Sequence, residues 1–97
     1  MNRPYEVMYI LDSRLDEEAQ KQINARVNDT IAKIGGKIEK SESLGRKRLA
    51  YPIKKRTDGV YMLTHFEGDS RSLKELNRVM NITEGLLRHL VVRRDED

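Results

Sequence analysis

The sequence of 97 residues has no cysteine, no tryptophan and only two histidines. The absence of cysteine excludes a disulfide framework, a thiolate nucleophile and a cysteine-ligated zinc site. The two histidines, His65 and His89, are isolated, so a histidine-rich metal motif is also excluded. No apolar run exceeds the five residues from Val7 to Leu11, whereas a membrane helix needs about 20. With no signal-peptide pattern before that run, we expect a soluble, cytoplasmic protein without metal, cofactor or membrane contact.

Charge is abundant but unevenly placed. The chain has 19 Lys and Arg against 16 Asp and Glu, which gives a net charge of +3. Residues 37–56 alone have a net charge of +6, so the rest of the chain is net −3. A basic segment in a mildly acidic body is typical of a protein that meets an anionic partner with one face. A solvated charged hairpin is the alternative interpretation.

Hydrophobic periodicity divides the chain into six elements of a single domain, residues 1–97, which ends in a short acidic tail at 95–97. Two apolar faces alternate over residues 5–11, which predicts a central strand. Helical spacing predicts a helix from about Asp16 to Ile34, ended by the glycine pair that follows. The remaining pattern predicts strands over 36–53, 60–67 and 86–93, a loop over 54–59 and a second helix over about 70–80.

Local signals refine this pattern at two places. Pro52 cannot donate to a ladder of hydrogen bonds, which places the second strand at a sheet edge. Ser72 and Glu75 have the spacing of a capping box at the start of the second helix. Asp69 and Ser70 are further cap candidates.

The order strand, helix, strand, strand, helix, strand predicts an α+β fold, the ferredoxin-like split βαββαβ sandwich. In this fold a four-stranded antiparallel sheet has both helices on one face. Either Met8 and Ile10, or Val7 with Tyr9 and Leu11, then face away from the helices. An open apolar face favours docking of another molecule, although scattered exposed aliphatic side chains are normal.

No arrangement of residues supports catalysis. The carboxylates at 16–18 fit the start of a helix, where negative charge is favourable, and those at 95–97 fit a solvated tail. Gly35 and Gly36 end a helix rather than open one, which is the wrong geometry for a phosphate-cradling loop. We therefore predict that the chain is not an enzyme and has no small-molecule substrate.

Two groups of cations favour binding to nucleic acid. Arg46 and Arg48 share one side of an extended segment with Lys47 between them, so the two arginines could straddle successive phosphates. The second group lies near the C-terminus and is offset only by Glu84; it comprises Arg78, Arg88, Arg93 and Arg94. Arginine suits planar pairing with phosphate. For each group by itself, solubility is the alternative interpretation.

Residues 58–62 offer a test for a base-stacking RNA module, whose central strand needs aromatic residues after a glycine. Only Gly59 matches that motif. Any RNA contact should therefore come from phosphates and shape rather than from stacked bases.

The segment from Gly45 to Lys54, GRKRLAYPIK, resembles the signature of the bacterial small-subunit ribosomal protein six family. Further matches follow in family order across essentially the whole chain; they are Tyr5 to Val7, Gly36 to Ile38, Gly59 with Tyr61, and Arg88 with Leu90 to Val92. The resemblance implies a ferredoxin-like structural constituent of the small ribosomal subunit. It also implies binding to the central domain of 16S rRNA as a heterodimer with small-subunit protein eighteen.

On this interpretation, we expect rRNA contacts from eight basic residues: Arg3, Arg46, Lys47, Arg48, Arg78, Arg88, Arg93 and Arg94. Four residues near the edge strand are expected to bind the partner protein or to belong to the core; they are Leu44, Leu49, Tyr51 and Ile53. The alternative from another class is a ferredoxin-like interaction or ligand-binding regulatory domain that does not bind rRNA.

Overall fold

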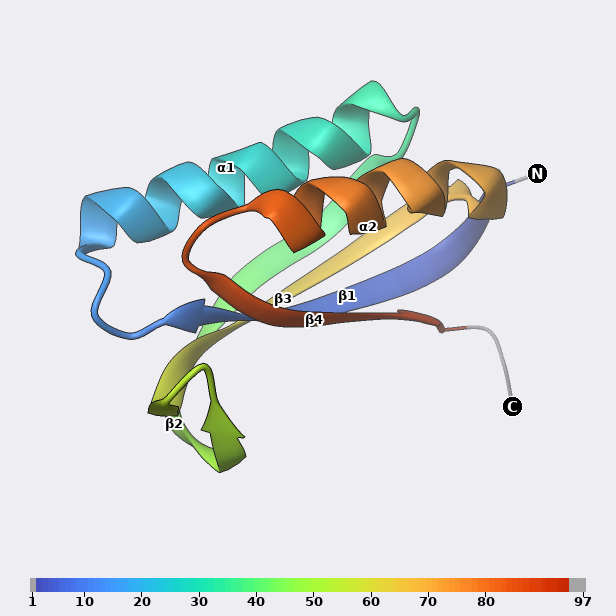
Figure 1. The fold of residues 1–97 in the computed structure, drawn as a ribbon. Coiled ribbons are helices and arrows are strands. Elements are labelled where there is room, and N and C mark those ends of the chain that lie inside the picture. Colours follow the sequence, from blue (N-terminus) through green and yellow to red (C-terminus); the bar gives the residue numbers. More distant parts are fainter. Residues whose placement is uncertain (1, 95–97) are drawn as a thin grey trace.

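Residues 2–94, which the computed structural model describes, form two layers, with both helices on one face of a four-stranded sheet (Figure 1). The acidic tail expected at 95–97 lies outside the described residues. The elements are β1 (Asn2–Asp12), α1 (Glu17–Lys33), β2 (Lys37–Ile53), β3 (Arg56–Asp69), the 3-10 turn η1 (Ser70–Ser72), α2 (Leu73–Ile82) and β4 (Leu86–Arg93). This is the predicted ferredoxin-like α+β sandwich.

The sheet has the strand order β2-β3-β1-β4, and every neighbouring pair is antiparallel. The predicted places of β1 at the centre and of β2 at an edge are therefore both confirmed. In the register, Ile10 lies opposite Tyr61 of β3 and Arg88 of β4, whereas Tyr5 lies opposite Arg93 near the other end of β4. Among residues 2–94, no helix is long and apolar enough to cross a membrane.

The core lies between the sheet and the helices. Tyr5, Val7, Tyr9 and Leu11 of β1 point toward the helices and are at most 4% exposed, because alternate residues of a strand share a face. They pack with buried residues of the other elements, namely Ile23, Val27, Ile31, Val60, Met62, Phe66, Leu76, Met80 and Leu86. Met8 and Ile10 are consequently the pair that faces away from the helices.

The two helices begin in different ways. Asp16 caps α1 by accepting a hydrogen bond from the backbone N–H of Ala19 at 2.8 Å, close to the predicted start. The predicted capping box of α2 is wrong, because Ser72 has helical dihedral angles and makes no capping hydrogen bond. The helical path starts earlier, at η1, and Asp69 caps η1 by accepting from the N–H of Arg71 at 2.9 Å.

The connection between β2 and β3 is much shorter than the loop predicted over 54–59. Ile53 pairs with Arg56, so Lys54 and Lys55 form a two-residue hairpin turn. Their φ angles are +49° and +66°, which defines a type I′ turn. Such turns usually contain Asn-Gly, and the lysine pair carries no such signal. The end of β2 curls beneath the sheet, on the side away from the helices (Figure 1).

Candidate nucleic-acid interface

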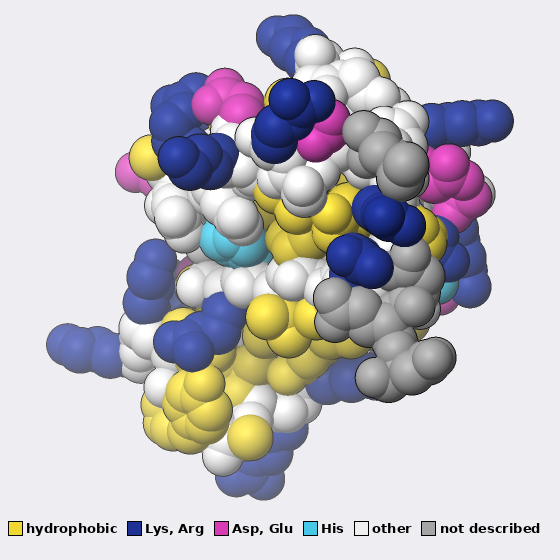
Figure 2. Space-filling view, turned by 90° about the vertical axis from the view of Figure 1, so that its right-hand side faces the viewer, with side chains coloured by type: hydrophobic (Ala, Val, Ile, Leu, Met, Phe, Trp, Pro, Cys, Tyr) yellow, Lys and Arg dark blue, Asp and Glu magenta, His cyan; other side chains and the backbone are white. Residues whose placement is uncertain are grey.

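The sheet face opposite the helices, called here the open face, carries apolar side chains from three strands. Met8 of β1 lies between Leu63 of β3 and Leu90 of β4. Leu90 is 64% exposed and Val92, farther along the same strand, is 41% exposed. Figure 2 shows hydrophobic side chains gathered on this side of the sheet, with Lys and Arg side chains around them. Residues 2–94 therefore leave part of this apolar surface exposed.

The curled end of the hairpin covers only one end of the open face. A Cβ on Gly59 would lie 2.4 Å from Ile10 and 3.7 Å from Leu49, so Leu49 packs close to β1 and β3 there. Leu49 and Ile53 are both 8% exposed. These two of the four predicted partner-binding residues are thus buried within the chain.

The other two predicted partner-binding residues remain accessible. Leu44 is half-buried beside a register shift of β2, whereas the ring of Tyr51 is exposed at 55%. Of the four, Tyr51 therefore presents the most surface to a second molecule.

Tyr51 also joins the hairpin to the opposite edge of the sheet. Arg88 of β4 donates a hydrogen bond to the Tyr51 hydroxyl at 3.0 Å, and its guanidinium lies 5.6 Å from the centre of the ring. This cation–π geometry orients Arg88. Because tyrosine is neutral, the contact leaves the positive charge of Arg88 uncompensated.

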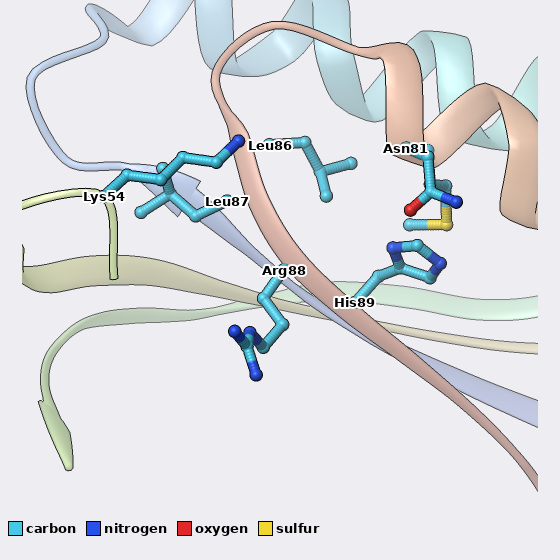
Figure 3. Close-up of a pocket in the computed structure, with 7 residues that line it drawn as sticks. Lys54, Asn81, Leu86, Leu87, Arg88 and His89 are labelled. Atoms are coloured by element: carbon cyan, nitrogen blue, oxygen red, sulfur yellow. The ribbon is translucent and has the colours of Figure 1, made fainter. Parts of the chain in front are cut away.

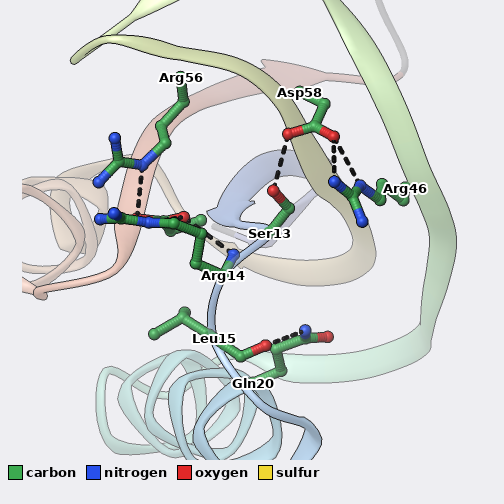
Figure 4. Close-up of polar contacts among 8 residues, drawn as sticks. Ser13, Arg14, Leu15, Gln20, Arg46, Arg56 and Asp58 are labelled. Carbon is green, nitrogen blue, oxygen red and sulfur yellow. Dashed lines mark hydrogen bonds and ion pairs between the residues drawn. The ribbon is translucent and has the colours of Figure 1, made fainter.

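Arg46, in contrast, forms an ion pair. Its guanidinium lies 2.6 Å from the carboxylate of Asp58, which also accepts a hydrogen bond from the Ser13 hydroxyl at 2.7 Å (Figure 4). The Ser13 hydroxyl and the Arg46 guanidinium together hold the pKa of Asp58 below its usual value. The neighbouring Lys47 lies 5.8 Å from the centre of the Tyr61 ring, and Arg48 is exposed.

The second predicted group of arginines does not form one cluster. Arg78 lies on α2 and pairs with Glu75 at 2.7 Å. Arg94 pairs with Glu39 of β2 and donates to the carbonyl of Tyr5 at 3.2 Å. The expectation that only Glu84 offsets this group is therefore wrong, since Glu75 pairs with Arg78 and Glu39 pairs with Arg94.

Strand geometry separates the members of this group that lie on or beside β4. Arg88 and Arg93 are five residues apart, which corresponds to roughly 17 Å along a strand. They also point to opposite faces, because one position is even and the other odd. Arg3 lies near Arg93, since Arg3 and Tyr5 are on the same end of β1 and Tyr5 opposes Arg93. Of these two residues of β4, Arg88 is the one that lies on the open face.

A groove beside Arg88 contains a cation that sequence reasoning did not list as a site residue. Lys54 of the hairpin turn and Arg88, His89 and Asn81 line it (Figure 3). His89 donates to or accepts from the Asn77 carboxamide at 3.0 Å, and burial lowers the pKa of His89. The sequence signal for Lys54 was its place in the basic segment, but its position beside β4 depends on the curl of the hairpin.

No group of three potential metal ligands occurs in the part of the chain that the structure describes. The candidate site is therefore a surface of cations and apolar side chains, with no metal centre among the described residues. Such a surface can bind an anionic polymer through its phosphates and a protein through its apolar part.

Residues 4–93 match the family model of ribosomal protein S6. The chain belongs to the ribosomal protein S6 family. It is 44% identical over 94 residues to small ribosomal subunit protein bS6 of Thermoanaerobacter pseudethanolicus, which covers 97% of this chain and 99% of that protein. Small ribosomal subunit protein bS6 of Corynebacterium aurimucosum is 42% identical and covers 96% of this chain and 97% of that protein.

A solved structure of an S6 protein has the same fold as this chain. The 30S ribosomal protein S6 of Thermotoga maritima superposes with a TM-score of 0.91 at 34% identity, covering 97% of this chain and 89% of that chain. The C-terminal domain of MgtC from Mycobacterium tuberculosis has a TM-score of 0.68 at 11% identity and shares the fold alone. Membership of the S6 family makes this chain a cytoplasmic component of the small ribosomal subunit and not an enzyme, as the sequence predicted.

Proposed function

We propose that the chain binds the central domain of 16S rRNA as a heterodimer with small-subunit protein eighteen. The observation that carries this proposal is the combination on the open face of exposed apolar side chains with a cation that has no carboxylate partner among residues 2–94. Leu90 and Val92 supply the first feature and Arg88 the second. Protein partners bury apolar surface, whereas RNA is attracted by uncompensated positive charge.

The RNA contacts are assigned to phosphates rather than to bases. On the open face Lys47 lies over the Tyr61 ring, so one side of that ring is already occupied. Arg48 is exposed, and no carboxylate among residues 2–94 pairs with Arg88. Each phosphate that such a cation neutralises releases counterions, so binding should weaken as salt increases.

A filter-binding titration of a central-domain 16S rRNA fragment tests the proposal. The chain is titrated alone and as an equimolar mixture with small-subunit protein eighteen, at several salt concentrations. We expect tight, salt-dependent binding by the mixture and much weaker binding by the chain alone. Failure of the mixture to bind the fragment would contradict the proposal, and binding without any effect of protein eighteen would contradict the heterodimer.

A matched pair of variants tests which face meets the protein partner. Leu90→Asp places a charge on the open face, and Ile82→Asp places the same charge on α2, where Ile82 is 58% exposed. Both native side chains are largely solvated, so both variants should fold. We expect Leu90→Asp to weaken association with protein eighteen at least tenfold and Ile82→Asp to leave it nearly unchanged, as measured by calorimetric titration. Equal affinities would exclude the open face as the protein-binding surface.

A further inference from the structure

A groove separates the turn of the β2–β3 hairpin from the start of β4 (Figure 3). Its apolar part contains Leu86 and Leu87, and its charged part contains Lys54 and Arg88. No carboxylate lines it. The two cations come from segments more than 30 positions apart in the sequence, and both line the groove because the hairpin curls under the sheet.

Lys54 lies in a turn whose backbone conformation is unfavourable for lysine. Lys54 and Lys55 both have positive φ angles, which residues with a Cβ seldom adopt. Asn and Gly are the residues that favour the two positions of a type I′ turn. Backbone strain of this kind is typical of binding sites, where the side chain at the strained position has a role that a better turn former could not perform.

We propose that this groove holds the sugar–phosphate backbone of one RNA strand, with Lys54 on one phosphate and Arg88 on another. The inference rests on the proposed rRNA binding and extends it to Lys54 and to this groove. In Figure 3 the charged ends of the two side chains point in different directions, so each meets a different phosphate of the strand. Two phosphates therefore define the register of the strand in the groove.

Charge favours a polyanion as the occupant. Lys54 has no ion-pair partner among residues 2–94, and there Arg88 donates its side-chain hydrogen bond to the neutral Tyr51 rather than to a carboxylate. Leu86 and Leu87 complete the lining and add no charge to oppose a phosphate. Asn81 adds an amide that can bond to a sugar hydroxyl or a phosphate oxygen.

Two single variants of the turn separate the role of Lys54 from the effects of charge and strain. Lys54→Asn and Lys55→Gly each remove one positive charge, and each introduces the residue that its position in the turn favours. Of these two lysines, only Lys54 lines the groove. Lys55→Gly is therefore the matched control, and both variants are compared with the wild-type chain.

The measurements are the midpoint of thermal unfolding and the salt-dependent binding of a central-domain 16S rRNA fragment in the presence of protein eighteen. We expect both variants to unfold at a higher temperature than the wild type. Lys54→Asn should also bind RNA about fivefold more weakly at 0.15 M salt, with a salt slope smaller by about one. Lys55→Gly should keep the wild-type affinity within about twofold.

Other outcomes would overturn the inference in distinguishable ways. If the wild type binds the RNA and Lys54→Asn binds equally well, the groove is not a phosphate site, although the proposed function stands. Equal losses in the two variants would show that the turn acts through net charge and would exclude a specific place for Lys54. If the wild-type heterodimer does not bind the fragment, the proposed function fails together with this inference.

Discussion

Both ends of β4 carry arginine, yet they differ in what surrounds the charge. At the end that contains Arg88, the neighbours are the neutral Tyr51 and the cationic Lys54. At the end followed by Arg94, the Arg94 guanidinium pairs with Glu39 and donates to the backbone carbonyl of Tyr5. The first end is thus available to an external anion, whereas the arginine at the second end ties β4 to β1 and β2. Arginines that look alike in the sequence thus differ in their availability in the fold.

The largest expected effect comes from disturbing the packing of β3 against β1 near the end of β4 that contains Arg88. Gly59→Ala would place a Cβ 2.4 Å from Ile10 and 3.1 Å from the Leu11 carbonyl, so we expect a loss of about 2 kcal/mol in the free energy of unfolding. Gly68→Ala is the matched change at the other end of β3, where the nearest atom is a Phe66 ring carbon at 3.3 Å. Urea denaturation should show a clearly smaller loss for Gly68→Ala, and equal losses would refute this account of the packing.

The second prediction compares the two arginines directly. Arg88→Ala should weaken binding of the heterodimer to rRNA by about 1 kcal/mol or more and reduce the salt slope by about one, because an uncompensated cation is lost. Arg94→Ala should have less effect on both, because Glu39 already pairs with that guanidinium. Filter binding across a salt series measures the two quantities. An unchanged slope for Arg88→Ala would remove that residue from the interface.

The third prediction concerns a variant that frees the charge of Arg94, so that the two ends of β4 become more alike. Glu39→Gln removes the carboxylate that neutralises Arg94 and leaves an amide oxygen to hold it in place. The released charge should strengthen rRNA binding by up to about fivefold at 0.15 M salt. Stability should change by no more than about 1 kcal/mol, since the pair is partly exposed. Combining Glu39→Gln with Arg94→Ala serves as the control, because the gain in affinity should then disappear.

The smallest effect concerns the pH dependence of stability at the Arg88 end. Burial lowers the pKa of His89 from its ordinary value of 6.5, so the unfolded chain binds a proton more readily than the folded chain. The contribution of His89 to stability is therefore present above pH 6.5 and lost as the pH falls through that value. His89→Gln should make the free energy of unfolding less sensitive to pH between about 8 and about 5.5, measured by denaturant titration. A steeper dependence in the variant would contradict the assignment.

Local pattern predicted most of the fold. The bounds of β4 and the placement of β1 at the centre agree with the structure, since strand alternation depends only on neighbouring residues. The start of α1 at Asp16 also agrees, because its cap is formed within one helical turn. The predicted loop over 54–59 was wrong because Lys54 and Lys55 form a tight turn without the residues that usually mark one. The predicted cap of α2 was wrong because the helical path already begins at η1, upstream of Ser72.

The sequence by itself determined the family, the order of the elements and the supply of positive charge. The signature from Gly45 to Lys54 lies in one continuous segment, so it can be recognised without a structure. Only the tertiary structure decided whether Arg88 and Arg94 remain available, because their partners are distant in the sequence. Arg94 meets Glu39 and Arg88 meets Tyr51 through the closing of the sheet and the curl of the hairpin. Whether a cation is free to bind an external anion depends on which groups lie close to it in space, and the separation of residues along the chain says little about that.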